Sequence, residues 1–322
     1  MRVGFDVSPL TQTGAGTARV VSGLRRALEG RQELELVPLS FGGTSRAATV
    51  VRDTAWYGGG IAWQARDLDV LHCTTMRGPV RARPPIVVTV HDVALLRLPD
   101  AFPTWHRHTG RLALRLSTGA ADAIVAVSEF TRDELVELLG IPRERIRVCP
   151  NGIEPVFRPE GPAAAGDYVL AVGTLEPRKN LARAVDAARL AGVELRVVGA
   201  SGWGGVAVPG WVGRLDDTQL AALFRGARCL VFPSLYEGFG LPILEAMACG
   251  TPVVTSRGGA TEEIAGGAAI LVDPLSAEAI AAGIGEAESR RAELVPLGLE
   301  RARPFTWARS ADVVESVWRE LA

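Results

Sequence analysis

Two glutamates, Glu237 and Glu245, stand on either side of a predicted helix start in the C-terminal half of the chain. Pro242 is tolerated in the first turn of a helix, and so we expect this helix to begin near Leu241. The first N–H groups of a helix have no partner within it, and they bind anions. A purely structural loop could use the glycines, but it would not need two carboxylates beside an anion site. The loop and first-turn residues concerned are Gly238, Phe239, Gly240 and Leu241.

A second anion-binding pattern follows an apolar run that ends at Val172. Gly173 and Thr174 come next, and Arg178 and Lys179 precede a predicted helix. Two cationic side chains and the free N–H groups of a helix start suit a diphosphate. Lys179 is the single lysine among the 35 Lys and Arg residues of the chain. Because a compact ammonium is not replaced by the planar guanidinium of Arg, we interpret Lys179 as a functional residue.

Two further patterns lie in the first half of the chain. Gly14 and Gly16 precede a predicted helix, where a glycine turn lets a phosphate or a sugar approach backbone N–H groups. Arg19 takes the third glycine position of a dinucleotide fingerprint, so a tight turn without a ligand stays open. His91 and Asp92 end a predicted strand, where ligands of open α/β sheets bind. The alternative is a loop histidine bonded to its neighbour.

Short apolar runs alternate with helical patterns along the whole chain, which predicts a doubly wound α/β fold. The runs do not alternate with polar residues, as expected of parallel strands buried on both faces. The predicted strands are Arg2–Val7, Leu34–Leu39, Val70–Cys73, Ile86–Val90, Ala123–Val127, Ile146–Cys149, Tyr168–Val172, Glu194–Val198, Cys229–Phe232, Val253–Thr255 and Ala269–Val272. The predicted helices are Gly16–Leu28, Phe130–Leu139, Leu181–Leu190, Thr218–Ala227, Leu241–Ala248 and Ala277–Glu288.

Local signals refine this outline. The stretch 157–166 is rich in Pro, Gly and Ala, and it predicts a boundary between two domains. Thr131 and Glu134 have the spacing of a capping box. Gly250 predicts the end of the helix that carries Glu245. Asn151 lies in a Pro-Asn-Gly turn, where we expect left-handed backbone geometry.

Composition excludes several classes of protein. The net charge is −1, which gives no basic footprint for nucleic acid. No apolar run approaches the length of a bilayer span, and the first residues do not resemble a signal peptide. The four cysteines have no zinc spacing, and we expect buried free thiols in a reducing cytoplasm. No cluster of His, Cys and carboxylates predicts a metal site.

The two anion-binding patterns together resemble the retaining glycosyltransferases of family 4, a large GT-B group. The motifs that carry the resemblance are Glu237-x7-Glu245 and, upstream of it, Gly173 with Arg178-Lys179-Asn180. The resemblance covers nearly the whole chain. The other motifs in the expected order are His91-Asp92, Val127–Phe130, Pro150–Ile153, Val272–Pro274 and Phe305–Trp307.

The resemblance implies two Rossmann-like domains that face each other across a cleft. Residues 1–157 would form the acceptor-side domain, and residues 158–304 the domain that binds the nucleotide sugar. Residues 305–322 would form a last helix that crosses back to the first domain. The implied location is the cytoplasm, with peripheral contact at the inner face of the membrane as a further option. Residues 107–115 interleave Arg and Leu, which fits either a solvated helix face or such a contact.

The resemblance also implies roles for single residues. Arg178 and Lys179 would hold the donor diphosphate, Glu237 would contact hydroxyls of the donor sugar, and Glu245 would accept hydrogen bonds from the ribose. His91 would hydrogen-bond the donor sugar near its reacting face. The implied catalytic residues are therefore His91, Glu237, Lys179 and Arg178. The implied donor-binding residues also include Gly14, Gly16, Gly173, Thr174, Gly238, Phe239, Gly240 and Leu241.

The implied chemistry needs neither a metal nor a cofactor. Fixed cations and a helix start stabilise the leaving nucleoside diphosphate more in the transition state than in the ground state. The family is thought to retain configuration by front-face attack, with the leaving phosphate accepting the proton of the acceptor. The acceptor would be a glycan, a lipid-linked molecule or a small molecule.

The chain departs from the family pattern at three places. Thr174 stands where much of the family has Arg, and Arg178 would compensate. The stretch Gly173–Asn180 resembles a subgroup with the same Gly-Thr-Leu-Glu-Pro-Arg-Lys-Asn pattern, many of whose members transfer mannose from GDP-mannose. The segment Gly199–Arg214 is short, and we expect it to lack a helix. Residues 58–60 are three glycines, which predict a mobile acceptor loop. The alternatives to a transferase are a GT-B sugar-nucleotide epimerase and a non-catalytic protein that binds nucleotide sugars.

Overall fold

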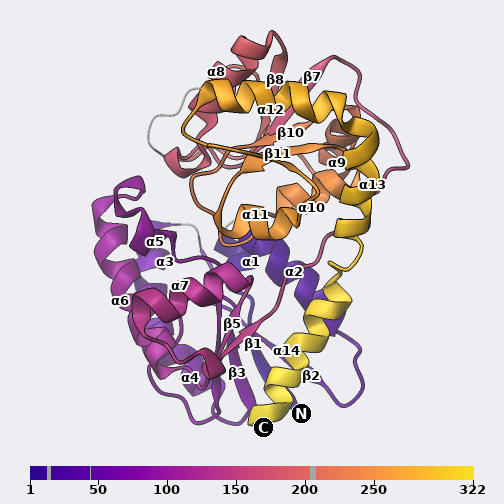
Figure 1. Cartoon of the computed structure of the whole chain (residues 1–322). Helices are drawn as coiled ribbons and strands as arrows, with labels where there is room; N and C mark the ends of the chain where they lie inside the picture. Colours follow the sequence, from indigo (N-terminus) through magenta and orange to yellow (C-terminus); the bar gives the residue numbers. More distant parts are fainter. Residues whose placement is uncertain (13–15, 44, 204–207) are drawn as a thin grey trace. The chain divides into compact units, whose positions relative to one another are not determined.

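The computed structural model describes residues 1–12, 16–43, 45–203 and 208–322, and these form two compact units. Unit 1 comprises Met1–Gly152 and Thr306–Ala322, and unit 2 comprises Ile153–Phe305. Each unit contains one six-stranded sheet whose strands pair in parallel. The predicted doubly wound α/β fold is therefore confirmed (Figure 1). The chain passes from unit 1 to unit 2 after Gly152, earlier than the predicted boundary at residue 157.

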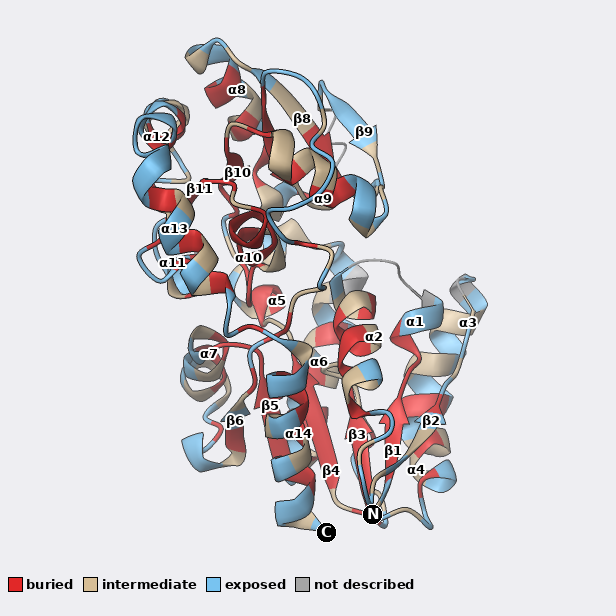
Figure 2. Ribbon diagram, turned by 90° about the vertical axis from the view of Figure 1, so that its right-hand side faces the viewer, coloured by how far each residue is buried: buried red, intermediate tan, exposed pale blue. Residues whose placement is uncertain are grey.

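The sheet of unit 1 has the strand order β2-β1-β3-β4-β5-β6. Its central strands β3, β4 and β5 are buried along their whole length, because helices cover both faces (Figure 2). The strands are β1 (Arg2–Asp6), β2 (Glu35–Leu39), β3 (Val70–Cys73), β4 (Ile86–Val90), β5 (Ala123–Ala126) and β6 (Ile146–Val148).

The sheet of unit 2 has the strand order β12-β11-β10-β7-β8-β9. Its strands are β7 (Tyr168–Val172), β8 (Glu194–Val198), β9 (Trp211–Gly213), β10 (Leu230–Phe232), β11 (Val253–Ser256) and β12 (Ile270–Val272). Every predicted strand is present to within one residue at each end. The edge strand β9 was not predicted, because its three residues are too few to show a pattern and its Trp and Val are exposed.

Helices flank both sheets, and every predicted helix is present to within one residue at each end. Unit 1 contains α1 (Pro9–Gln12), α2 (Gly16–Leu28), α3 (Arg46–Val51), α4 (Ile61–Gln64), α5 (Ala94–Arg97), α6 (Thr104–Ala120), α7 (Glu129–Leu139) and α14 (Trp307–Leu321). Unit 2 contains α8 (Leu181–Ala191), α9 (Asp217–Gly226), α10 (Leu241–Ala248), α11 (Gly259–Ala265), α12 (Ala277–Ser289) and α13 (Arg291–Ala302). The described part of the segment 199–214 contains no helix, as expected.

Three local predictions are wrong. The cap of α7 is Ser128, whose side chain accepts a hydrogen bond from the N–H of Thr131, so Thr131 lies inside the helix. The glycines 58–60 do not form a loop: they are the last residues of a π-helix, η1 (Arg52–Gly60), which is kinked at Gly59 and in which Trp56 and Tyr57 are buried. Asn151 does not have a positive φ, whereas Asn180 does, at 57°.

The C-terminal helix α14 is part of the core of unit 1. Val314, Val317 and Trp318 are buried against Phe5 of β1 and residues of α2. The Nε1–H of Trp318 donates to Nδ1 of the fully buried His72, at 3.2 Å. Helix α14 therefore stabilises unit 1.

Candidate active site

The two predicted anion-binding patterns lie side by side at one edge of the sheet in unit 2. Strands β7 and β10 are neighbours and run in parallel, so the loops that follow them leave the sheet at the same edge. The loop after β7 contains a short 3₁₀ helix, η4 (Pro177–Lys179). The N–H of Leu235, in the loop after β10, donates to the carbonyl of Arg178 at 2.8 Å. This hydrogen bond fixes one loop against the other.

Charged side chains from both loops form a largely buried cluster. Lys179 Nζ lies 2.6 Å from Glu237 Oε1, and Arg178 Nη1 lies 2.9 Å from Glu237 Oε2. Arg178 Nη2 lies 2.7 Å from Oε1 of Glu176. The exposed fractions are 13% for Lys179, 15% for Arg178, 9% for Glu237 and 4% for Glu176. Two cations are thus held at the sheet edge by two carboxylates, which restricts the positions of their charged groups.

The electrostatics of Glu237 follow from this geometry. Burial alone would raise the pKa of its carboxyl group, but the charges of Lys179 and Arg178 outweigh burial and lower the pKa below the ordinary value. Glu237 is therefore ionised at neutral pH. It can accept hydrogen bonds, and it cannot donate a proton.

The turn between β7 and the cluster leaves room for the lysine side chain. A Cβ atom on Gly173 would lie 3.3 Å from both Cγ and Cδ of Lys179, a tight contact. The N–H of Gly173 donates to the carbonyl of Val198 at 2.8 Å, and a Cβ atom on Gly199 would meet the carbonyl oxygen of Gly173. Thr174 follows in the same turn. The glycines therefore allow the lysine and the neighbouring loop to pack closely.

Asn180 fixes the end of this turn. Its backbone is left-handed, with φ at 57°, and its Nδ2 donates to the carbonyls of Pro233 at 2.9 Å and Pro274 at 2.7 Å. Asn tolerates this conformation better than most residues. The turn that carries Lys179 is thus anchored to the loops after β10 and β12.

Helix α10 begins at Leu241, as predicted, with Gly240 at its N-cap. The φ of Gly240 is +108°, a value that L residues rarely adopt. In the described part of the chain, the N–H groups of Phe239, Gly240 and Leu241 donate to no protein acceptor. Glu245 lies on the same helix with 1% exposed. Gly250, with φ at +74°, follows the last turn. The loop therefore offers N–H groups next to the charged cluster.

The remaining predicted site residues belong to unit 1. His91 follows β4, and its Nε2 lies 2.9 Å from the carbonyl oxygen of Thr74. Burial lowers the pKa of His91 and outweighs the opposite effects of the Thr74 carbonyl and Asp92. Asp92 accepts from the N–H of Ala94 at 3.0 Å rather than pairing with His91. Gly16 is the first residue of α2, and Gly14 lies outside the described residues.

Two sets of residues escaped the sequence reasoning. The motif around Lys179 assigned no role to Glu176, although a carboxylate two residues before Arg178 could have indicated the ion pair. In unit 1, the hydroxyl of Tyr57 donates to Oδ2 of Asp6 at 2.8 Å. Burial raises the pKa of this aspartate, whose Oδ1 accepts from the N–H of Ser8. The sequence pattern that could have indicated this pair is a single Asp, Asp6, at the end of an apolar strand.

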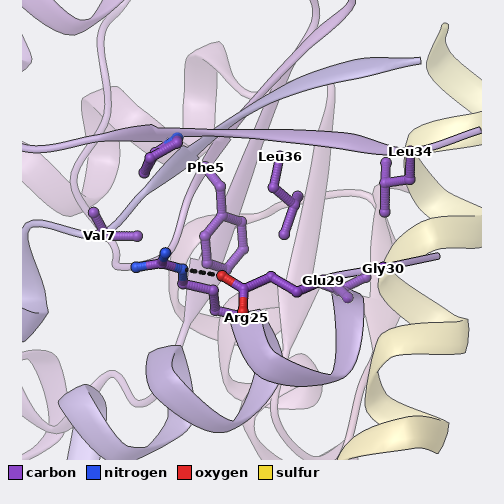
Figure 3. Close-up of a pocket in the computed structure, with 9 residues that line it drawn as sticks. Phe5, Val7, Arg25, Glu29, Gly30, Leu34 and Leu36 are labelled. Atoms are coloured by element: carbon purple, nitrogen blue, oxygen red, sulfur yellow. Dashed lines mark hydrogen bonds and ion pairs between the residues drawn. The ribbon is translucent and has the colours of Figure 1, made fainter.

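A pocket of about 120 Å³ lies elsewhere in unit 1, between α2 and the strands β1 and β2. Phe5, Leu28 and Leu36 form part of its apolar wall, and an ion pair between Arg25 and Glu29, at 2.7 Å, lies at its edge (Figure 3). No predicted site residue that the structure describes lines this pocket.

Three further properties of the described residues bear on function. No group of three or more His, Cys, Asp or Glu side chains could hold a metal ion. No helix is long and apolar enough to cross a membrane. The four cysteines are free and buried, as predicted.

Two known domain families match the chain. Residues 15–157 match the family described as glycosyltransferase family 4. Residues 154–296 match the family described as glycosyl transferases group 1. The second match contains the whole charged cluster and helix α10.

Individual proteins agree with this assignment. The O-antigen chain mannosyltransferase B of Escherichia coli is 32% identical over 280 residues, which is 76% of this chain and 73% of the relative. The sucrose-phosphate synthase of Thermosynechococcus elongatus has a similar fold, with a TM-score of 0.81 over 100% of this chain and 99% of that chain, at 19% identity. The Anabaena protein HepE in complex with UDP and glucose has a TM-score of 0.78 at 18% identity, with 100% of both chains covered. The chain therefore belongs to the group 1 and family 4 glycosyltransferases, enzymes with the GT-B fold.

Proposed function

We propose that the chain is a retaining hexosyltransferase that transfers mannose from GDP-mannose to a glycan, a lipid-linked molecule or a small molecule. The observation that carries this proposal is the cluster of Lys179, Arg178 and Glu237 beside the N–H groups at the start of α10, which have no acceptor among the described residues. The choice of mannose is supported by the E. coli relative, which is named a mannosyltransferase. A UDP sugar is the competing donor, because the similar Anabaena structure holds UDP and glucose.

In this proposal, Lys179 and Arg178 bind the diphosphate of the donor. The N–H groups of Phe239, Gly240 and Leu241 bind donor oxygens, since the start of a helix favours negative charge. The diphosphate would also lie next to Gly173, Thr174 and Gly238. Glu237 accepts hydrogen bonds from hydroxyls of the sugar, and Glu245 accepts them from the ribose.

The proposed reaction needs no further reagent. The bond between the anomeric carbon and the diphosphate oxygen breaks, and the diphosphate leaves with the electron pair. The acceptor oxygen bonds to the anomeric carbon on the same face, and its proton passes to the leaving diphosphate. Because negative charge grows on the diphosphate, fixed cations and N–H groups lower the barrier. The proposed reaction requires neither a metal ion nor a cofactor.

The residues of unit 1 have proposed roles as well. We assign His91 to a hydrogen bond with the donor sugar. Its burial lowers its pKa, so that a neutral ring is available at neutral pH. Gly14 and Gly16 are assigned to the diphosphate. The observation on Gly16 that fits this role is that a Cβ atom there would meet none of the described residues within 4 Å.

A membrane-bound acceptor would be compatible with one face of α6. Leu112 and Leu116 are 59% and 48% exposed on this helix, and Arg115 is exposed beside them. Arg107 pairs with Asp100, however, and Arg111 donates to a carbonyl of α5. Of the three arginines in the stretch 107–115, these two therefore bind groups of their own unit. Co-sedimentation with anionic vesicles tests this contact, and the variant L112S/L116S is expected to weaken it.

Release of nucleoside diphosphate from GDP-mannose, UDP-glucose and other nucleotide sugars tests the proposed function, with a panel of acceptors. We expect Lys179→Ala and Glu237→Ala to lower turnover by about 100-fold or more. Arg189→Ala, a change at a residue 79% exposed on α8, is the matched control and should leave turnover unchanged. Turnover that survives in both cluster variants would reject the assigned roles. The anomeric configuration of the product tests retention.

A further inference from the structure

The charges of the cluster cancel each other. Arg178 and Lys179 carry two positive charges, and Glu176 and Glu237 carry two negative ones. Each oxygen of Glu237 accepts from a different cation, at 2.6 and 2.9 Å. The cations that would bind a diphosphate are therefore already paired.

A diphosphate cannot simply be added to this arrangement. Near pH 7 it carries at least two negative charges, and in a half-buried site like charges a few ångströms apart repel strongly. A carboxylate must therefore release at least one cation when the diphosphate binds. Glu237 is the carboxylate that contacts both cations, and it lies in a glycine-rich loop beside Gly238 and Gly240. Glu176 pairs with Arg178 from within the turn and is the more deeply buried of the two.

We propose that Glu237 is a resident counter-ion that is exchanged for the donor diphosphate, and that this exchange makes the protein discriminate a nucleotide sugar from the bare nucleoside diphosphate. The inference rests on the proposed function and adds to it a preference for the nucleotide sugar over the nucleoside diphosphate. When a complete donor binds, the sugar hydroxyls give Glu237 new hydrogen-bond donors in place of the lost cations. A bare nucleoside diphosphate displaces Glu237 from the cations and offers it nothing in return. A buried carboxylate that loses its partners is costly.

The consequence concerns the product of the reaction. After sugar transfer, the nucleoside diphosphate remains in a site whose cations are again attracted by Glu237. The carboxylate therefore favours release of the product over retention. In the same way, the protein in a mixture of donor and spent nucleotide binds the donor preferentially.

Calorimetric titration of the full chain tests this inference, with GDP and GDP-mannose, or with UDP and UDP-glucose if the uridine nucleotides stabilise the protein. Glu237→Gln keeps the size of the side chain and removes its charge. We expect the variant to bind the nucleoside diphosphate about tenfold more tightly than the native chain. Binding of the nucleotide sugar should change much less, so that the ratio of the two dissociation constants falls. Glu176→Gln is the matched control, because it removes the same charge from the same cluster.

The outcomes are distinct. If both variants tighten both ligands equally, the effect is general electrostatics and the exchange is overturned. If Glu237→Gln leaves the ratio unchanged, Glu237 does not discriminate, and the proposed function still stands as long as the native chain releases nucleoside diphosphate in the assay above. If the native chain binds no nucleotide sugar at all, the proposed function itself fails. Thermal unfolding of each variant confirms that it is folded.

Discussion

Acidification is expected to destabilise unit 1 through one buried histidine. His72 lies in β3 and is fully buried, with Nε2 2.8 Å from the hydroxyl of Thr89 and Nδ1 accepting from the indole of Trp318. The neutral ring therefore donates through Nε2. A second proton on Nδ1 would face the N–H of Trp318. Burial, followed by the nearby His91, lowers the pKa of His72 from 6.5 to about 3.

The magnitude follows from linkage between protonation and folding. In the unfolded chain this histidine takes up a proton as the pH falls through 6.5, whereas in the folded chain it stays neutral until about pH 3. Its stabilising effect is therefore complete above pH 6.5, and it is lost as the pH falls from 6.5 towards 3. Between pH 7.5 and 5.0, the free energy of unfolding should fall by about 2 kcal/mol because of this group.

Urea unfolding at pH 7.5 and 5.0 measures this effect, with His72→Asn as the test variant. Asn can still accept from Trp318 through its amide oxygen, but it does not titrate. We expect the variant to be less stable at pH 7.5 and to lose about 2 kcal/mol less than the native chain on acidification. His108→Asn, at an exposed position of α6, should leave the pH dependence unchanged. Parallel pH dependence of the native chain and His72→Asn would refute the reasoning.

Three further expectations concern the site in unit 2. Asn180→Ala removes three hydrogen bonds, the two that Nδ2 donates and the one that Oδ1 accepts from Arg183, and it strains a left-handed turn. We therefore expect a loss of about 2–3 kcal/mol in urea unfolding. Asn180→Gly should lose less, and equal losses would show that the backbone conformation is unimportant. Gly240→Ala places a side chain at a φ of +108°, and we expect it to lower the free energy of unfolding by about 1–3 kcal/mol. Calorimetry should also show weaker nucleotide binding. Unchanged binding would show that the start of α10 does not contact the nucleotide. Addition of EDTA should leave turnover unchanged, because Lys179 and Arg178 supply the positive charge; a loss restored by a divalent cation would contradict this.

The fold could be predicted because buried parallel strands have a simple signature. Runs such as Ile86–Val90 are apolar on both faces, and all five residues of this run are buried. Strand β9 has no such signature, since Trp211 and Val212 are 44% and 47% exposed. The prediction of a loop at the glycines 58–60 was wrong for a different reason. Glycine usually ends a helix, but here η1 extends to Gly60 with a kink at Gly59, and its residues Trp56 and Tyr57 are buried.

The sequence also indicated the residues of the candidate site, but not their contacts. The residue types and the helix start indicated an anion site around Lys179 and α10. The sequence could not show that Glu237 pairs with both cations, because residues 178 and 237 meet only when β7 and β10 become neighbours. The pairing of Glu176 with Arg178 depends in the same way on the 3₁₀ turn between them.

A crystal structure of the full chain with bound nucleoside diphosphate tests the central claim most directly. Thermal shifts with GDP, UDP, ADP and TDP select the nucleotide, since a ligand that binds the native state raises its stability. We predict that diphosphate oxygens lie within hydrogen-bonding distance of Lys179 Nζ and Arg178, beside the N–H groups at the start of α10. At least one contact of Glu237 with these cations should be broken. A diphosphate bound elsewhere, with both contacts of Glu237 intact, would contradict the account.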